Sequence, residues 1–221
     1  METFKKYLKW FFNSFIWLAI VLYAIDVISK NIIINNADNI LASGGMHGGV
    51  DLIPGFLGIS YTINQNIAFG LSLSSPLANR IVFSIVALLV VIGIIIALIL
   101  KWGKINKFYR ATMMMIIAGA LGNVTDRIFY SAEYLNHGGI SGVVDWIDFY
   151  GIWEFNFNIA DSCVVVAAFM IIIYMIVDEI KEYRKKSKLI DKSKEDNQKV
   201  LSKTEQEKNQ LMQEGKEEDN E

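Results

Sequence analysis

The sequence contains only one cysteine, Cys163, in a chain of 221 residues. A single cysteine cannot form an internal disulfide, and no Cys/His spacing here is typical of a structural metal site. The two histidines, His47 and His137, lie in the glycine-containing polar segments GGMHGG and NHGG, and we interpret them as surface-loop residues rather than metal ligands. Basic patches interleaved with base-stacking aromatic residues are also missing, so nothing favours nucleic acid binding.

Charged residues are scarce over most of the chain. The composition is 53% hydrophobic with a mean hydropathy of +0.34, which is well above a typical soluble domain. From about Asp178 onward, Lys, Glu, Gln, Asn and Asp replace the apolar runs. We therefore expect one membrane domain, residues 1–178, followed by a charged cytoplasmic tail, residues 179–221, that is helical or disordered.

Four apolar stretches approach the roughly 20 residues that a helix needs to cross the hydrocarbon core. They cover about residues 10–28, 81–100, 108–125 and 157–177. The third is the shortest in uncharged length, and Arg110 is placed at one end of it, where a long side chain can reach the interface. A cleaved signal peptide is a less favoured interpretation of the first stretch, because no A-x-A site follows it.

Basic residues gather on one side of these spans. They precede the first span, lie between the second and third, and follow the fourth: Lys5, Lys6, Lys9, Lys101, Lys104, Lys107, Arg110, Lys181, Arg184, Lys185, Lys186 and Lys188. The two long loops on the other side carry only Lys30, Arg80 and Arg127 at their membrane edges. Because cytoplasmic loops carry an excess of Lys and Arg, we expect both termini to be cytoplasmic and the two long loops to face outward.

The outward loops have sequence patterns of their own. Aromatic and β-branched residues alternate between glycines over Gly55–Leu73, which predicts short strands or a hairpin. Residues 143–157 are rich in Trp, Phe and Tyr, which favours a loop on the outer membrane surface. The expected fold is an all-α membrane protein of four transmembrane helices, with a small outward-facing β-rich region and a polar C-terminal tail.

Polar residues gather at the outer ends of the spans. A polar group in lipid must face another polar group or a water-filled cleft. The set consists of Asp26, Lys30, Asn64, Asn123, Asp126, Arg127, Asp145, Asn158 and Asp161. Asp26 and Lys30 are four residues apart and can pair on one helix face. For these two and Asp126, a hydrogen-bond network that only holds the helices together is an equally good interpretation.

Asp161 is the strongest candidate for chemistry, because it lies inside an apolar span with no neighbouring base in the sequence. Asn158 is one helical turn earlier, and Asp145 can reach Asp161 if the intervening loop folds back. Two carboxyl groups that lie close together in a low-dielectric site share one proton and titrate as a pair. This is the arrangement of an aspartic protease, in which one carboxylate activates water and the protonated one polarises the carbonyl.

Two other aspartates remain as possible partners of Asp161. Asp126 is a weaker candidate, because the adjacent Arg127 favours its charged form. Asp148 lies three residues beyond Asp145.

Five short motifs then resemble those of the lipoprotein signal peptidases, the signal peptidase II family. They follow the family's order and cover about residues 10–178. The motifs are DVISK at residues 26–30, NQNIAFG at 64–70, GNVTDR at 122–127, VVDW at 143–146 and FNIADS at 157–162.

The resemblance implies an aspartic endopeptidase, a hydrolase of the bacterial cell membrane with its active site at the outer leaflet. It implies cleavage of prolipoprotein signal peptides just before a cysteine that carries diacylglycerol. It also implies a monomeric protein that is surrounded by membrane lipid and needs no metal and no cofactor. By motif position, Asp145 and Asp161 are the catalytic pair. The other residues position the substrate or the pair (Asn64, Asn123, Arg127 and Asn158) or support the site (Asp26, Lys30 and Asp126).

The sequence departs from the family pattern in two places. Asn66 and Ile67 replace the usual Gly-Ala, and the segment 128–142 is longer than expected. A catalytically inactive homologue is therefore one alternative. A small transporter or proton channel that uses Asp145 and Asp161 as a relay is another, and a structural membrane scaffold is a third.

Overall fold

The computed structural model describes residues 1–45, 48–65, 75–130, 142–150 and 152–218. The chain divides into two compact units, Met1–Ile171 and Ile172–Glu221. Both histidines, the Asn66–Ile67 departure and residues 131–141 of the long segment lie outside the described residues.

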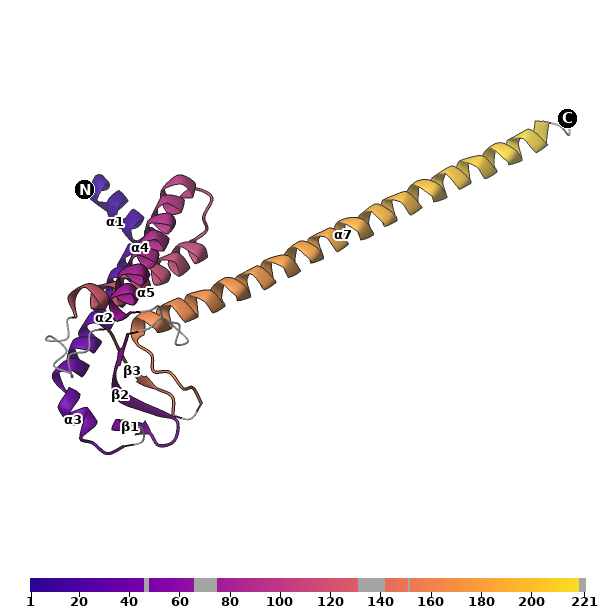
Figure 1. Ribbon diagram of the computed structural model, residues 1–221. Helices are drawn as coiled ribbons and strands as arrows, with labels where there is room; N and C mark the ends of the chain where they lie inside the picture. Colours follow the sequence, from indigo (N-terminus) through magenta and orange to yellow (C-terminus); the bar gives the residue numbers. More distant parts are fainter. Residues whose placement is uncertain (46–47, 66–74, 131–141, 151, 219–221) are drawn as a thin grey trace. The chain divides into compact units, whose positions relative to one another are not determined.

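The first unit contains five helices among its described residues, and a further helix begins within it (Figure 1). They are α1 (Glu2–Ser14), α2 (Ile16–Asn35), α3 (Ala37–Leu41), α4 (Pro76–Lys101), α5 (Lys107–Phe129) and the start of α7 (Ile159–Glu218). Local caps explain where two of them begin. Ser75 accepts a hydrogen bond from the Ala78 amide before α4, and Asn106 accepts one from the Tyr109 amide before α5.

Three helices of the described chain are long and apolar enough to cross a membrane: Ile16–Asn35, Pro76–Lys101 and Ile159–Lys192. The protein is therefore a multi-pass membrane protein. A helix also forms over the expected span 108–125, but α5 is not among these candidates. Charged and polar residues such as Arg110, Asn123 and Asp126 lower its hydropathy, so the expectation of four spans is not confirmed.

The first span differs from the predicted residues 10–28. Phe15 adopts a left-handed conformation, with φ of 61°, and this interrupts the helix between Ser14 and Ile16. At the other end, α2 continues to Asn35 because the polar side chains of Asp26 and Lys30 are buried against neighbouring elements rather than exposed to lipid.

Three antiparallel strands, β1 (Val50–Ile53), β2 (Leu57–Asn64) and β3 (Val143–Asp148), form one sheet in the order β1-β2-β3. The fold is therefore mostly helical rather than all-α. Strand β2 lies within the predicted β-rich loop. Strand β3 lies where we expected a surface loop, because residues 143–148 pair with β2, Thr62 opposite Asp145 and Asn64 opposite Val143.

The pairing of β3 also fixes the start of α7. The Phe157 amide donates to the Ile147 carbonyl at 2.9 Å, and the Ile147 amide donates back at 2.8 Å. Phe157 is therefore extended, and the helix starts at Ile159 rather than at the predicted 157. The helix then continues through the second unit, as a single helix to Glu218.

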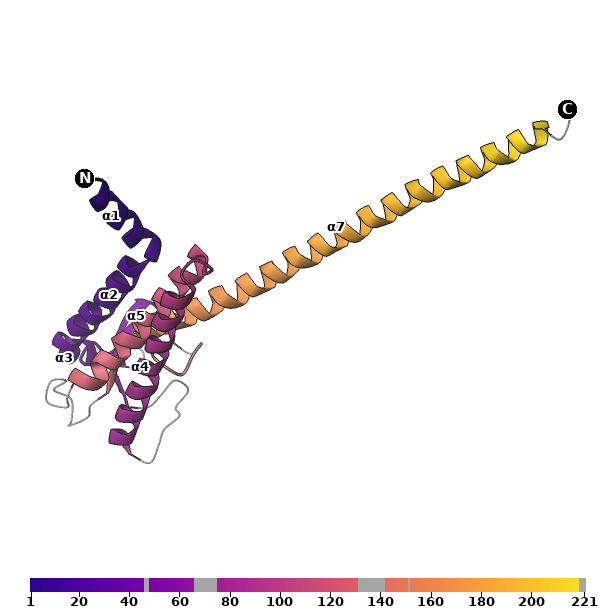
Figure 2. The same cartoon turned by 90° about the horizontal axis from the view of Figure 1, so that it is seen from above.

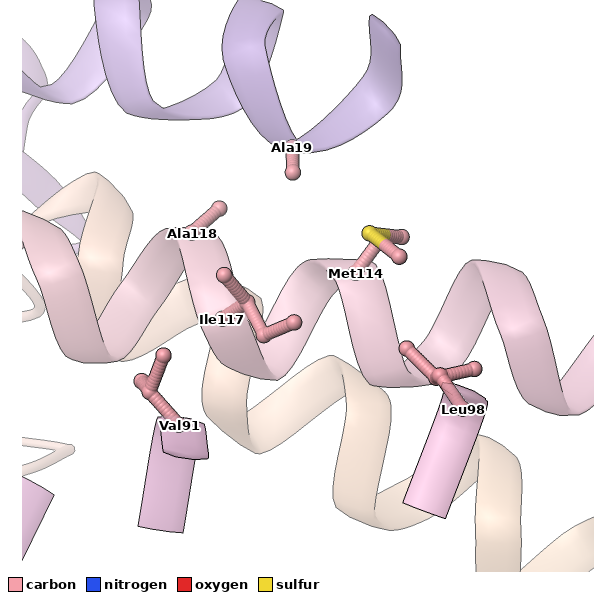
Figure 3. Packing of buried hydrophobic residues seen from close by; sticks show 6 residues of the cluster. All are labelled: Ala19, Val91, Leu98, Met114, Ile117 and Ala118. Carbon is pink, nitrogen blue, oxygen red and sulfur yellow. The ribbon is translucent and has the colours of Figure 1, made fainter. Parts of the chain in front are cut away.

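A small apolar core joins α2, α4 and α5 (Figure 3). Figure 3 shows side chains of all three helices pointing toward one another: Ala19, Val91, Leu98, Met114, Ile117 and Ala118. A second cluster packs the sheet against α2 and α3, with Ile33, Ile40, Tyr61, Tyr130 and Val144 buried. The two clusters hold one end of α2 and α5 against β3.

Candidate active site

Two carboxylates share one lysine where α2 meets α5. The Lys30 ammonium lies 2.7 Å from Asp26 Oδ2 and 2.9 Å from Asp126 Oδ2. All three side chains are almost completely buried. We call Asp26, Lys30 and Asp126 the ion-pair cluster. The predicted pairing of Asp26 with Lys30 is confirmed, and Asp126 is a second partner of the same lysine.

The ion-pair cluster also holds backbone from two other elements. Asp26 Oδ1 accepts a hydrogen bond from the Ala160 amide at 2.8 Å, at the start of α7. Asp126 Oδ2 accepts one from the Val144 amide in β3 at 3.2 Å. The cluster therefore fixes where α7 and β3 stand relative to α2 and α5.

Asn123 connects this cluster to Asp161. Its amide oxygen accepts hydrogen bonds from Lys30 at 3.2 Å and from Asn158 at 3.1 Å. Its amide nitrogen donates to Asp161 Oδ1 at 2.7 Å. Because two donors point at the oxygen, the orientation of the amide is fixed and its N–H faces the carboxylate.

Asn158 is the N-cap of α7 and forms a reciprocal cap with Asp161. Its side-chain oxygen accepts a hydrogen bond from the Asp161 backbone amide at 2.8 Å, and its own backbone amide donates to Asp161 Oδ2 at 3.3 Å. This is the pattern of a capping box, with an aspartate at the third helical position. Asp161 thus lies in the first turn of α7, where the helix dipole favours a negative charge.

Asn158 also reaches the second aspartate. Its amide nitrogen donates to Asp145 Oδ1 at 2.7 Å, while Asn64 at the end of β2 donates to Asp145 Oδ2 at 2.9 Å. Asp145 is 2% exposed and Asn158 is fully buried. One asparagine therefore contacts both carboxyl groups, and we call Asp145 and Asp161 the aspartate pair.

The environment of Asp145 favours its protonated form. Burial, with the neighbouring Asp161 carboxylate, raises the pKa of Asp145 to about 8, against the hydrogen bonds from Asn64 and Asn158 and the charge of Lys30. Asp145 is therefore mostly neutral at pH 7. A neutral carboxylic acid can donate a hydrogen bond, which a carboxylate cannot do.

Close backbone packing brings Asp161 and Asn123 together. A Cβ atom at Gly119 would lie 2.4 Å from the Ala160 carbonyl oxygen, and one at Gly122 would lie 2.5 Å from Asp26 Oδ2. Only glycine allows α5 to approach the start of α7 this closely.

The other candidate partners of Asp161 occupy different positions. Asp126 belongs to the ion-pair cluster. Asp148 is three residues from Asp145 on the same strand, and an odd spacing places the two side chains on opposite faces of the sheet. Arg127 follows Asp126 on α5 and donates to the Asn123 carbonyl oxygen at 3.3 Å.

Sequence reasoning missed one residue that orders the site. Asn156 donates to Ser60 Oγ at 2.6 Å and to Thr62 Oγ1 at 2.7 Å, and so ties the segment before α7 to β2. The capping box was also missed, although the N-x-x-D spacing of Asn158 and Asp161 is its sequence signal. For metals, no group of three His, Cys, Asp or Glu in the described part of the chain is arranged to hold an ion.

Comparison with known proteins shows the family of the chain. The family model of Signal peptidase (SPase) II matches residues 18–177. A lipoprotein signal peptidase of Clostridioides difficile is 34% identical over 168 residues, covering 76% of this chain and 97% of that protein. One from Desulfitobacterium hafniense is 36% identical over 171 residues, covering 76% and 96%.

A solved structure is also similar. A bacterial membrane enzyme structure determined at 2.3 Å resolution by the in meso method superposes with a TM-score of 0.56 at 28% identity. The match covers 74% of this chain and 88% of that one. The family model and the relatives extend over most of the chain, and residues 18–177, which the family model matches, contain the positions of all five motifs quoted above. The chain belongs to the signal peptidase II family, a family of aspartic peptidases.

Proposed function

We propose that this protein removes signal peptides from prolipoproteins by aspartic catalysis, with Asp145 and Asp161 as the catalytic pair. The observation that carries this proposal is the single asparagine, Asn158, that hydrogen-bonds both carboxyl groups. A protonated Asp145 beside a charged Asp161 would supply what peptide hydrolysis with an activated water requires.

In the proposed reaction, the Asp161 carboxylate removes a proton from a water molecule, and the resulting hydroxide attacks the scissile carbonyl carbon. Asp145 donates its proton in a hydrogen bond to the carbonyl oxygen, where negative charge develops. The tetrahedral intermediate then collapses as the C–N bond breaks and the amine leaving group takes a proton from the pair. Asn64 and Asn123 hold the two carboxyl groups in place throughout.

Four transmembrane helices remain part of the proposal, with α5 as the fourth. At about 1.5 Å per residue, its 23 residues are long enough to cross the hydrocarbon core. Thr112 and Asp126 are completely buried, so polar residues that lower its hydropathy do not face lipid. The loop between α4 and α5 is basic, which favours a cytoplasmic location for that end of the helices. Both chain termini lie on the same side by this argument. The membrane domain 1–178, with the charged tail 179–221 on the cytoplasmic side, follows from the same argument.

This orientation puts the site at the outer leaflet of the bacterial cell membrane. Three apolar residues of the segment between β3 and α7 are exposed there: Ile152, Trp153 and Phe155. The Phe157 ring packs against the rings of Phe149 and Trp153, with centroids 6.2 Å apart in each pair. An exposed aromatic surface beside the aspartate pair is suited to the acyl chains of a diacylglyceryl cysteine. The protein would act as a monomer.

The test is cleavage by the purified protein in detergent. Wild-type protein should shorten a diacylglyceryl-modified prolipoprotein, with mass spectrometry giving a new N-terminus at the modified cysteine. The same precursor with that cysteine replaced by serine, and the Asp161→Asn enzyme, are the matched controls and should give no product. Folded wild-type protein that cleaves nothing would instead support the inactive homologue. The transporter and scaffold alternatives have no support in the family to which the chain belongs.

A further inference from the structure

The N-terminal helix α1 has two chemically distinct faces and little protein to cover them. Its apolar residues Phe4, Leu8 and Phe11 follow the i, i+4, i+7 spacing of one helix face. Lys5, Lys6 and Lys9 lie on the other side. The Phe4 side chain is 69% exposed and Tyr7 is 67% exposed, so the apolar face has no partner over most of its length.

The helix is nevertheless held at a fixed angle to the first span. Phe15 adopts a left-handed backbone conformation at the bend. Ser14 stabilises the bend, since its hydroxyl donates to the Phe11 carbonyl at 2.7 Å and accepts from the Ile16 amide at 3.2 Å. Figure 2 shows α1 leaving α2 at this bend rather than continuing along it. A helix that turns away where a membrane span begins is suited to lie along the membrane surface.

Contacts with the α4–α5 loop fix the same end of α1. The Arg110 guanidinium donates to the Asn13 carbonyl at 3.5 Å and to the Trp102 carbonyl at 2.7 Å. It lies 4.0 Å from the centre of the Trp102 ring, and the rings of Trp10 and Trp102 are 6.1 Å apart. Tryptophan rings gather at the headgroup level of a bilayer. The C-terminal end of α1 therefore lies at the level of the interface, next to the α4–α5 loop.

We propose that α1 is an interfacial helix that binds anionic phospholipids of the leaflet on the basic side of the bundle. Its apolar face lies at the boundary of headgroups and acyl chains, and its three lysines contact the headgroup phosphates. The occupant is the bilayer of the protein's own spans, because α1 is joined to α2 through one residue and cannot leave that surface. Lys101, Lys104 and Lys107 at the same end add to the positive charge.

Spin labelling of the full-length protein tests this surface. Replacing Cys163, the only cysteine, with alanine leaves no native thiol, so Leu8→Cys or Lys6→Cys can be labelled alone. In nanodiscs that contain phosphatidylglycerol, we expect the label at position 8 to be accessible to oxygen and protected from a water-soluble nickel chelate. The label at position 6 should show the reverse. In pure phosphatidylcholine, which has no net charge, the difference in nickel access between the two positions should shrink. It should also shrink in 1 M salt, since the Debye length falls to about 3 Å at that ionic strength.

Two sets of variants separate charge from apolar contact. Lys5→Gln, Lys6→Gln and Lys9→Gln together should remove the dependence on phosphatidylglycerol at position 8. The matched control, in which Lys188, Lys192 and Lys194 are changed to Gln, should retain the dependence on phosphatidylglycerol. Phe4→Asn should expose position 8 to nickel in either lipid. Equal nickel access at positions 6 and 8 in anionic nanodiscs, or dipolar broadening from two α1 helices in contact, would overturn the proposal.

Discussion

The site contains two pairs of buried carboxyl groups that are stabilised in different ways. In the ion-pair cluster, Lys30 lies between Asp26 and Asp126 and supplies a positive charge to both. In the aspartate pair, the shared residue is Asn158, whose neutral side-chain amide donates to Asp145 and whose backbone amide donates to Asp161. A cation keeps both of its carboxylates ionised, whereas an amide does not compensate two negative charges. The ion-pair cluster is therefore suited to structure and the aspartate pair to proton transfer.

Replacing either member of the aspartate pair should have the largest effect on activity. Asp145→Asn and Asp161→Asn should each lower the cleavage rate by about 10²–10⁴-fold, because each removes a group that we propose moves a proton. Asp148→Asn, also buried in β3 but on the opposite face from Asp145, should remain active. Rates from a gel-shift assay of the precursor measure all three. If Asp126→Asn were inactive while Asp145→Asn cleaved normally, Asp126 would replace Asp145 in the pair.

Removal of the cation should affect stability more than any other change. Lys30→Met leaves Asp26 and Asp126 buried without a counter-charge, and we expect a loss of about 3–5 kcal/mol. Thermal unfolding in detergent would measure this. The same assay on Asp161→Asn should show a much smaller change, because that variant leaves no charge unpaired. A Lys30→Met protein as stable as wild type would contradict the role given to the ion-pair cluster.

Asn158 has two tasks that substitution can separate. Serine is also a good N-cap, so Asn158→Ser should keep most of the stability, but its shorter side chain cannot bridge to Asp145. Asn158→Ala should in addition lose about 0.5–2 kcal/mol of capping free energy. Both variants should cleave more slowly than wild type. Normal cleavage by Asn158→Ser would show that the bridge between the two aspartates is dispensable.

Two glycines test the close packing between α5 and α7. Gly122→Ala would force a methyl group against Asp26 and Ala160, with an expected loss of about 1–3 kcal/mol. Gly93→Ala in α4 is the matched control, because nothing lies within 4 Å of its added carbon and alanine favours a helix. Thermal unfolding of the two variants should move in opposite directions.

The sequence predicted which polar residues meet, because apolar spans leave buried carboxylates few ways to be satisfied. It predicted the pairing of Asp26 and Lys30, and it favoured Asp145 over Asp126 as the partner of Asp161. The bend at Phe15 was not predicted, since no glycine or proline marks it. Strand β3 was also missed: the aromatic residues of 143–157 suit a membrane surface and a strand equally well, and only the pairing with β2 decides between them.

The pH dependence of cleavage tests the shared proton most directly. Asp145 has a pKa of about 8, so it is protonated below that pH and loses its proton above it. We therefore predict that kcat/KM is sustained through neutral pH and falls about tenfold per unit as the pH rises beyond 8. Stability should be followed over the same range, to separate this loss from unfolding. A rate that stays constant to pH 10 in folded protein would contradict the account, because the second carboxyl group would then act without a proton.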